Sequence, residues 1–124
     1  MGIFTFDHIH IFASDVAATK AWFIDLFGAE DAGTNATGMP RLRLGGTTFL
    51  LRGERPGEGL TATAEKRHFG TAHIGFRVED LDAVYAELEA KGVRFEQPPL
   101  QAAPGLKITF LRGPDDVRLE LLQF

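Results

Sequence analysis

The chain has 124 residues, the size of a single domain that buries about two thirds of its unfolded surface, and its 44% hydrophobic and 24% charged residues are typical of globular proteins. The net charge is −4, so the composition does not indicate a basic surface that binds nucleic acid. The lack of cysteine excludes disulfides, zinc–thiolate sites and cysteine nucleophiles. No apolar run approaches the roughly 20 residues of a membrane span, and no basic-then-apolar secretory signal is visible, so we expect a cytoplasmic protein with no nucleic-acid or membrane partner.

The N-terminal part predicts a strand, a helix and a hairpin. Apolar residues alternate along Phe4–Ala13, which is the period of a strand, and Phe6, His8, His10 and Phe12 share one face. Ser14 or Asp15 caps a helix that ends at Gly28. A short strand and a turn-rich stretch follow. Two further strands, Arg41–Leu44 and Thr47–Leu51, then join across Gly45-Gly46, a two-residue hairpin signal.

Residues 54–70 form a glycine-, proline- and charge-rich linker. Connections longer than about 12–15 residues are usually functional or mobile. The glycines permit this segment to close over a cleft but do not require it. His68 lies in the linker and either contacts a substrate or is simply solvated.

The C-terminal part repeats the same order of elements. Thr71–Val78 alternates as a strand, with His73 and Arg77 on one face, and Asp80 caps a helix that Gly92 ends. Three more strands are expected, at Val93–Glu96, Lys107–Arg112 and Val117–Phe124. Each half is therefore predicted to be a βαβββ unit.

A repeated phrase shows that the two halves are copies of one unit. The letters DHIHIFASDVAA begin at Asp7, and AHIGFRVEDLDA begins at Ala72. His8 and His73 are separated by 65 residues, as are Asp15 and Asp80. We therefore predict one domain, 1–124, built of module 1 (1–53), the linker (54–70) and module 2 (71–124).

Two histidines and one carboxylate are candidates for a metal site. Glu120 alternates with core-facing leucines on the last strand and faces the same side of its sheet as His73. A carboxylate in the interior of a curved sheet is costly unless it is paired or bound to a metal. Together with His8, these side chains form a facial set that leaves coordination positions open and suits divalent iron.

The twin βαβββ units, the pair DHIHI and AHIGF, and GPDDVRLELLQ near the end resemble the vicinal oxygen chelate superfamily. That superfamily includes glyoxalase I, methylmalonyl-CoA epimerase, extradiol ring-cleaving dioxygenases, fosfomycin resistance proteins and the metal-free bleomycin resistance proteins. The resemblance implies an α+β fold in which two modules form an open mixed β-sheet around a cleft. It also implies a divalent metal held by His8, His73 and Glu120, a substrate chelated through two adjacent oxygens, and a homodimer. Each cleft then uses either one chain or two.

The sequence departs from the family at the fourth ligand position. The repeat places Leu50 where module 2 has Glu120, whereas glyoxalase-like and epimerase-like relatives carry Glu or Gln. Leucine neither ligates nor moves a proton, so three ligands remain, as in the ring-cleaving dioxygenases and the fosfomycin enzymes. Fe²⁺ is therefore favoured, with Mn²⁺, Ni²⁺ and Zn²⁺ as alternatives.

His10 is the candidate catalytic residue. It lies two residues beyond His8 on the same face, where module 2 has Gly75, and is either a proton-transferring base or a packed wall of the cavity. Either His8 or His10 can be the first ligand, and the repeat favours His8.

The candidate substrate pocket combines apolar and basic side chains. Arg41 binds an anionic group of the substrate or is merely a solvated strand residue, and Arg77 is a candidate for the cleft lining. An apolar wall would suit an aromatic or hydrophobic substrate; it consists of Phe6, Phe12, Leu50 and Leu122.

These features favour a metal-dependent enzyme that acts on a small organic molecule, with a non-haem Fe²⁺ dioxygenase ahead of a glyoxalase-like lyase or epimerase. Two further alternatives are a metal-free drug-binding or resistance protein and a thiol transferase of the fosfomycin type.

Overall fold

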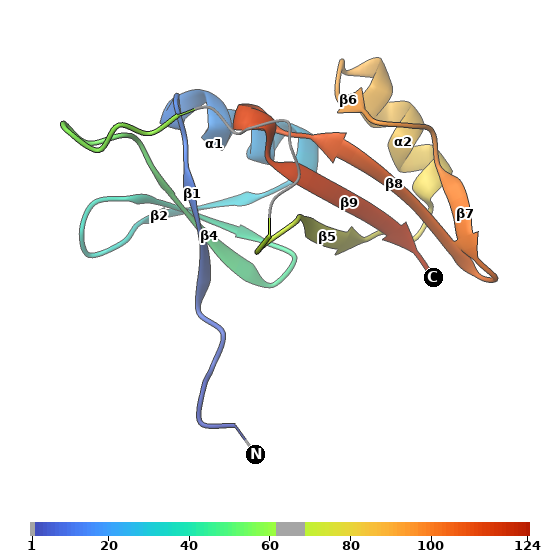
Figure 1. Cartoon of the computed structure of the whole chain (residues 1–124), viewed down its shortest axis with the longest axis horizontal. Coiled ribbons are helices and arrows are strands. Elements are labelled where there is room, and N and C mark those ends of the chain that lie inside the picture. The colour runs from blue at the N-terminus through green and yellow to red at the C-terminus, as the bar shows by residue number, and fades with distance from the viewer. Residues whose placement is uncertain (1, 62–68) are drawn as a thin grey trace. The chain divides into compact units, whose positions relative to one another are not determined.

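The computed structural model describes residues 2–61 and 69–124. The chain divides into two compact units, Met1–Leu60 and Thr61–Phe124, which are described in turn (Figure 1). His68, and with it any contact of this residue with a substrate, lies outside the described residues.

The first unit is a four-stranded mixed sheet with one helix. Its sheet order is β1-β4-β3-β2, in which β1 runs parallel to β4 and the other pairs are antiparallel. Its elements are β1 (His8–Phe12), α1 (Val16–Phe27), β2 (Glu30–Thr34), β3 (Pro40–Leu44) and β4 (Thr47–Arg52). The first strand is shorter than predicted: it begins at His8, and the segment before it projects from the sheet with Phe6 70% exposed (Figure 1).

Local chemistry sets the elements of this unit. The Asp15 carboxylate accepts from the Ala18 N–H at 3.0 Å and begins α1, and Gly28 ends it in the left-handed region at φ 69°. Gly45 and Gly46 both have positive φ, 60° and 78°, which is what a two-residue turn between twisted strands requires. One sheet face packs against α1, where Phe23 stacks on Phe49 with ring centroids 5.8 Å apart.

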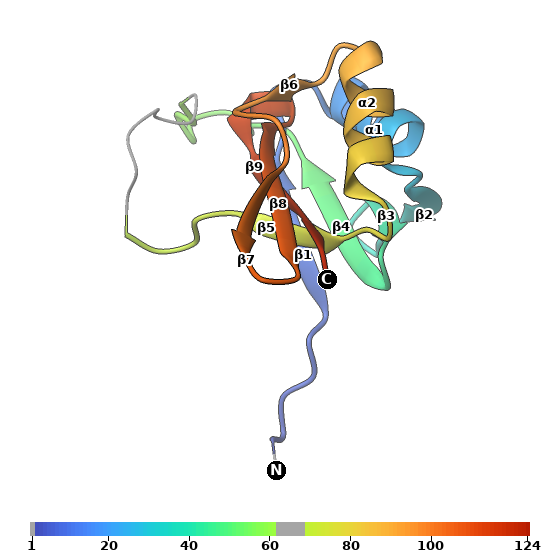
Figure 2. The same ribbon diagram turned by 90° about the vertical axis from the view of Figure 1, so that its right-hand side faces the viewer.

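The second unit is a five-stranded mixed sheet with one helix. Its order is β5-β9-β8-β6, and β7 also pairs with β8. The parallel pair is again the first strand with the last, β5 with β9, and α2 covers one face of the sheet (Figure 2). The elements are β5 (Ile74–Arg77), α2 (Leu81–Ala90), β6 (Arg94–Phe95), β7 (Leu100–Ala103), β8 (Leu106–Arg112), a 3-10 turn η1 (Pro114–Asp116) and β9 (Arg118–Gln123).

The prediction of one strand at Val93–Glu96 was incomplete, because two short strands, β6 and β7, pair with successive parts of β8. Pro98 and Pro99 separate them, since proline has no N–H to donate to a ladder. Between the two ladders the Thr109 hydroxyl donates to the Gln97 carbonyl at 2.6 Å. This bond satisfies a fully buried hydroxyl, so the interrupted strand stays attached to the sheet.

The fold class is α+β, as predicted. Among the described residues there are two α-helices and two open mixed sheets of four and five strands. No helix in this part of the chain is long and apolar enough to cross a membrane.

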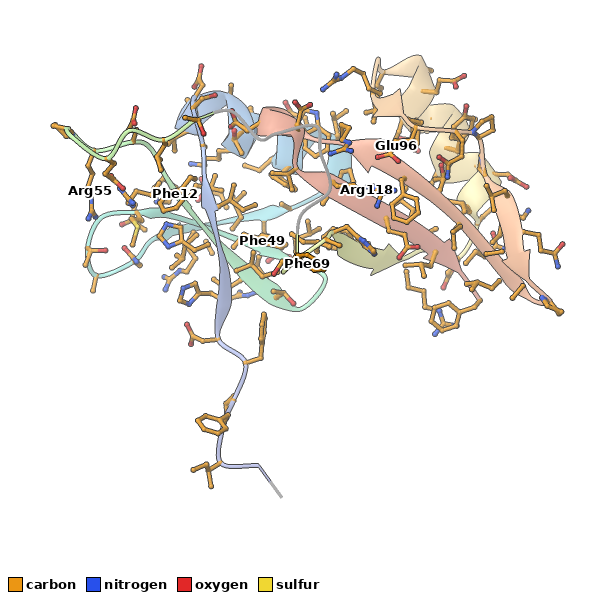
Figure 3. All side chains as sticks on the ribbon, viewed as in Figure 1. Phe12, Phe49, Arg55, Phe69, Glu96 and Arg118 are labelled. Carbon is orange, nitrogen blue, oxygen red and sulfur yellow. The ribbon has the colours of Figure 1, made fainter. Side chains whose placement is uncertain are left out.

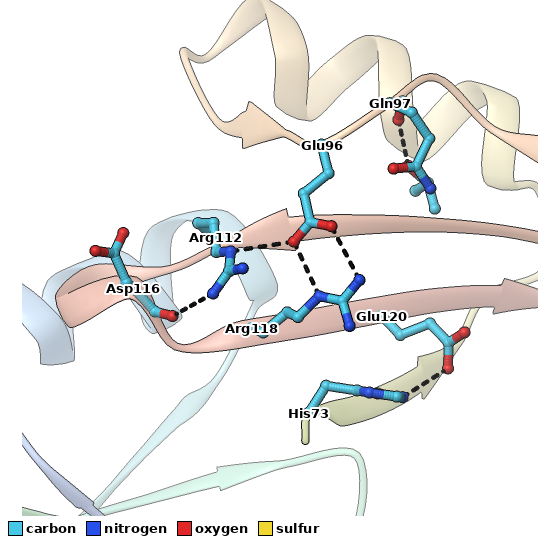
Figure 4. Close-up of polar contacts among 8 residues, drawn as sticks. His73, Glu96, Gln97, Arg112, Asp116, Arg118 and Glu120 are labelled. Atoms are coloured by element: carbon cyan, nitrogen blue, oxygen red, sulfur yellow. Dashed lines mark hydrogen bonds and ion pairs between the residues drawn. The ribbon is translucent and has the colours of Figure 1, made fainter. Parts of the chain in front are cut away.

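An ion cluster joins Glu96, the residue after β6, to β8 and β9 on the face opposite α2. Glu96 accepts from Nε and Nη2 of Arg118, both at 2.9 Å, and pairs with Nε of Arg112 at 3.0 Å (Figures 3 and 4). The hydrogen bonds from Arg118 lower the pKa of Glu96 against the opposing effect of its partial burial. The paired carboxylate therefore helps to hold the short strand β6 to the longer hairpin.

Replacing Asp80 by alanine should lower the melting temperature, because its carboxylate caps α2 by accepting from the Ala83 N–H at 3.1 Å. We expect a loss of about 1 kcal/mol, typical of a helix N-cap. Asp80→Asn keeps an acceptor and should lose much less in thermal unfolding followed by circular dichroism. Equal losses in the two variants would mean that the cap does not stabilise the helix.

The stabilising effect of Glu96 should disappear in acid. Its pKa is lower folded than unfolded, so its contribution is present above about pH 4.3 and is lost as the pH falls through the folded value. Urea unfolding at pH 7 should show Glu96→Gln about 0.5–1 kcal/mol less stable than the wild type, and the two should converge near pH 3. Glu79→Gln, at an exposed position, should match the wild type at both pH values. A Glu96→Gln deficit that persists in acid would contradict this account.

Candidate metal centre

The second unit brings two of the predicted ligands together. His73 lies immediately before β5, and Glu120 is on β9 opposite Gly75 in the parallel ladder. His73 Nε2 and Glu120 Oε1 are 3.2 Å apart, and their side chains are 31% and 14% exposed (Figure 4). Residues that are 47 positions apart in the chain thus meet on one face of the sheet.

The separation of these two atoms fits a shared cation. Metal bonds of about 2.1 Å to an imidazole nitrogen and a carboxylate oxygen, at angles of about 90° to 109°, place the two donor atoms about 3.0–3.4 Å apart. Gly75 lies against both Glu120 and Leu122, because a Cβ there would be 3.6 Å from Glu120 Oε1, an ordinary contact, and 3.3 Å from Leu122 Cδ1, a tight one. His73 and Glu120 could therefore both ligate one metal with little rearrangement.

The first unit presents His8 and His10 on the sheet face that α1 does not cover. Their ring centroids are 6.3 Å apart. Asp7 Oδ2 lies 2.7 Å from His8 Nδ1, so a proton on Nδ1 would leave the Nε2 lone pair available for a metal. Sequence reasoning missed Asp7, although an acidic residue beside a candidate ligand histidine is a signal that could have been used. This contact supports His8, rather than His10, as the first ligand.

The surroundings of His10 favour its neutral form. Burial is the largest cause that lowers its pKa, followed by the positive charges of Arg52, His8 and Arg55. Its ring also packs against that of Phe12, with centroids 5.4 Å apart. A neutral imidazole can accept a proton, so His10 has the chemistry of a base as well as the packing of a cavity wall.

The three predicted ligands are divided between the units. His8 belongs to the first unit, whereas His73 and Glu120 belong to the second. Within the part of the chain that is described, no group of three His, Asp or Glu side chains is close enough to hold a metal. The structure thus brings two of the three predicted ligands into contact, and the ligand roles of all three stay predictions.

The parallel ladders support the predicted correspondence of Leu50 and Glu120. Leu50 pairs with His10 in the first unit, just as Glu120 pairs with Gly75 in the second. Leu50 is only 7% exposed. An apolar, buried side chain thus stands at the fourth ligand position.

The other predicted pocket residues of the first unit lie in different surroundings. Phe12 is 49% exposed beneath the Arg52 guanidinium, whose Cζ is 4.6 Å from the ring centroid. Phe6 precedes β1 and is solvent-exposed. Arg41 pairs with Leu50 and donates from Nε to the Ala32 carbonyl at 3.1 Å, which leaves its terminal nitrogens for other partners. The structure therefore places Phe12, Leu50 and Arg41 on the histidine face of the sheet.

In the second unit the Arg77 side chain contacts Phe124. Its guanidinium lies 4.0 Å from the Phe124 ring centroid and donates to a Phe124 main-chain oxygen. Leu122 is half-buried beside Gly75 and pairs with Arg77 in the ladder. The predicted role of Arg77 in lining a pocket thus competes with an intramolecular contact.

Comparison with known proteins agrees with this architecture. Residues 5–121 match the family model of the Glyoxalase/Bleomycin resistance protein/Dioxygenase superfamily. The protein YaeR of Escherichia coli (strain K12) is 29% identical over 136 residues, covering 99% of this chain and 98% of YaeR.

Two solved structures share the fold over nearly their whole length. A glyoxalase family protein from Enterococcus faecalis is 26% identical, with a TM-score of 0.79, and covers 99% of this chain and 100% of its own. The fosfomycin resistance protein FosX from Listeria monocytogenes, solved with Mn(II) and 1S,2S-dihydroxypropylphosphonic acid, is 19% identical, with a TM-score of 0.73 and coverages of 97% and 90%. The family match extends over both modules, so the chain belongs to the Glyoxalase/Bleomycin resistance protein/Dioxygenase superfamily.

Proposed function

We propose that the protein is a metal-dependent enzyme that acts on a small organic substrate bound to a divalent cation through its oxygens. The contact of His73 with Glu120, at 3.2 Å, carries this proposal. It joins the two donor types that divalent iron and related metals use, at a distance that suits adjacent ligands of one ion. His8, at the equivalent position of the repeat, would be the third ligand.

A bound metal would supply a Lewis acid and a template for the substrate oxygens. The roles of the protein are to hold the cation and to orient and cover the substrate. Asp7 would fix the tautomer of His8. The Mn(II) in FosX, a protein of the same fold, supports a divalent metal here.

Leu50 makes oxygen chemistry the favoured reaction class, with Fe²⁺ as the favoured metal. A buried leucine at the fourth position supplies neither a ligand nor a proton carrier. Three protein ligands leave positions for a chelating substrate and for dioxygen, as in Fe²⁺ oxygenases. Phe12 and Leu50 on the histidine face would suit an aromatic or otherwise apolar substrate.

A glyoxalase-like lyase or epimerase is the second candidate, and His10 is the observation that favours it. Such chemistry needs a base near neutral pH, and the lowered pKa of His10 provides an unprotonated imidazole there.

Metal content of the purified protein is the direct test. Protein prepared without chelators should contain iron, manganese, nickel or zinc near one equivalent by elemental mass spectrometry. His73→Ala and Glu120→Gln should lose it, because each removes one donor of the 3.2 Å pair. Glu87→Gln, at an exposed carboxylate of α2, is the matched control and should keep it. If the wild-type protein contains no metal, even after reconstitution, the proposal of a metal-dependent enzyme is wrong and a metal-free binding protein becomes the favoured function.

The reaction class should be decided by substrate panels. The iron-loaded protein should consume oxygen with at least one catechol, and His73→Ala should not. Turnover of the methylglyoxal–glutathione adduct without oxygen uptake would instead establish the lyase. In that case His10→Gln should abolish turnover while metal content is kept.

A further inference from the structure

The His73 ring is held by side chains rather than by the sheet. The residue lies just outside the ladder, whose first pair is Ile74 with Leu119. Besides Glu120, the ring meets Phe110 with centroids 5.1 Å apart and planes at 86°. This edge-to-face geometry is within the range in which aromatic pairs attract each other.

Phe110 is itself fixed on two sides. It lies on β8 directly opposite Glu120 in the antiparallel pair β8–β9, so both side chains occupy the same face. The Arg118 guanidinium lies over its ring, with Cζ 3.9 Å from the centroid. Glu96 holds that guanidinium through two hydrogen bonds of 2.9 Å (Figure 4). A continuous series of contacts thus runs from Glu96 to the histidine.

We infer that Phe110, clamped by Arg118, is a positioning residue that holds the His73 imidazole against Glu120. The inference rests on the proposed function in so far as His73 is a metal ligand. An unrestrained imidazole samples several rotamers, and ordering it on ligation costs free energy. A ring already held beside Glu120 avoids most of this cost, so loss of the clamp should weaken metal binding while both donor atoms remain.

Electrostatics alone predicts the opposite effect of removing Arg118 on metal affinity. Its positive charge is two residues from Glu120 on the same face of β9, where it repels an incoming cation. Removing the charge should then tighten metal binding. Positioning predicts that removing Arg118 weakens binding, because Phe110 is no longer held.

The first experiment titrates Mn²⁺ alone, with the free ion followed by electron paramagnetic resonance. Phe110→Leu should weaken binding roughly tenfold, at the low end of losses seen when groups that orient a ligand are removed. Phe110→Tyr keeps the ring and should restore the affinity. Phe95→Leu is the matched control. Phe95 packs against Tyr85 in the same unit, with ring centroids 4.6 Å apart, and the variant should bind Mn²⁺ like the wild type.

A second pair of variants covers the case in which Phe110→Leu does not fold. Arg118→Met should weaken Mn²⁺ binding about threefold. Arg112→Met is the matched control. Arg112 also pairs with Glu96 and donates to the Asp116 carbonyl, so the variant removes the same charge from Glu96 and should not weaken Mn²⁺ binding. Tighter binding in Arg118→Met would overturn the inference in favour of simple repulsion.

Three-bond couplings across χ1 of His73, measured on the metal-free protein, separate the two proposals. The wild type and Phe95→Leu should show one rotamer, and Phe110→Leu should show averaging. A wild type that binds neither Mn²⁺ nor Fe²⁺ would overturn the proposed function, while averaging confined to Phe110→Leu would still sustain the positioning role. Wild-type couplings in Phe110→Leu would overturn the positioning role, as would, for a wild type that binds Mn²⁺, an affinity of Phe110→Leu equal to that of Phe95→Leu.

Discussion

The parallel pairing of the first strand with the last strand in each unit is the constraint on which the candidate centre depends. Parallel neighbours need a long crossover, and here a helix followed by antiparallel strands, two in the first unit and three in the second, fills it. The pairing brings His73 to Glu120 across most of the second unit. A shift of the register by one residue would turn Glu120 to the other face of the sheet, toward the leucines that pack there. The site thus depends on the same alternation that builds the core.

The two copies of this arrangement have diverged into different chemical roles. In the second unit the register pair is Gly75 with Glu120, a glycine beside a carboxylate. In the first unit the equivalent pair is His10 with Leu50, an imidazole beside an apolar, buried side chain. The second copy therefore has a carboxylate where the first has an apolar side chain, and the first has an imidazole with a lowered pKa where the second has glycine.

Local patterns were sufficient to predict most of the fold. Alternation identified the strands, and Asp15, Gly28 and the Gly45-Gly46 pair marked the boundaries where the structure has them. The repeat also predicted that Leu50 corresponds to Glu120, which the two ladders bear out. The second short strand, β7, was not predicted, although Pro98 and Pro99 mark the break between β6 and β7. The hydrogen bond from the Thr109 hydroxyl to the Gln97 carbonyl keeps the interrupted segment on the sheet, and sequence periodicity does not predict such a side-chain contact.

Contacts across strands could not be predicted in the same way. Phe110 and Arg118 are separated from His73 by more than thirty positions in the chain, and neither belongs to the repeated phrase. Their importance appears only when the register of β8 with β9 places Phe110 beside Glu120. Arg77 illustrates the converse: its position on the ligand face is correct, but its guanidinium turns to Phe124. Sequence therefore predicts which face a side chain occupies more reliably than which partner it finds there.

The pairing of His73 with Glu120 also explains how a half-buried carboxylate is tolerated before any cation binds. A carboxylate that is 14% exposed loses much of its hydration, and a proton on His73 Nε2, 3.2 Å away, would replace part of it. Ligation requires that nitrogen to give up its proton, so proton and metal compete for one position. The contact of His73 with Glu120 keeps the two donor atoms near the separation that adjacent ligands have. The contacts among Phe110, Arg118 and Glu96 would keep the His73 ring in place once its hydrogen bond to Glu120 is lost. The contacts that stabilise this carboxylate thus also hold the two predicted ligands close together.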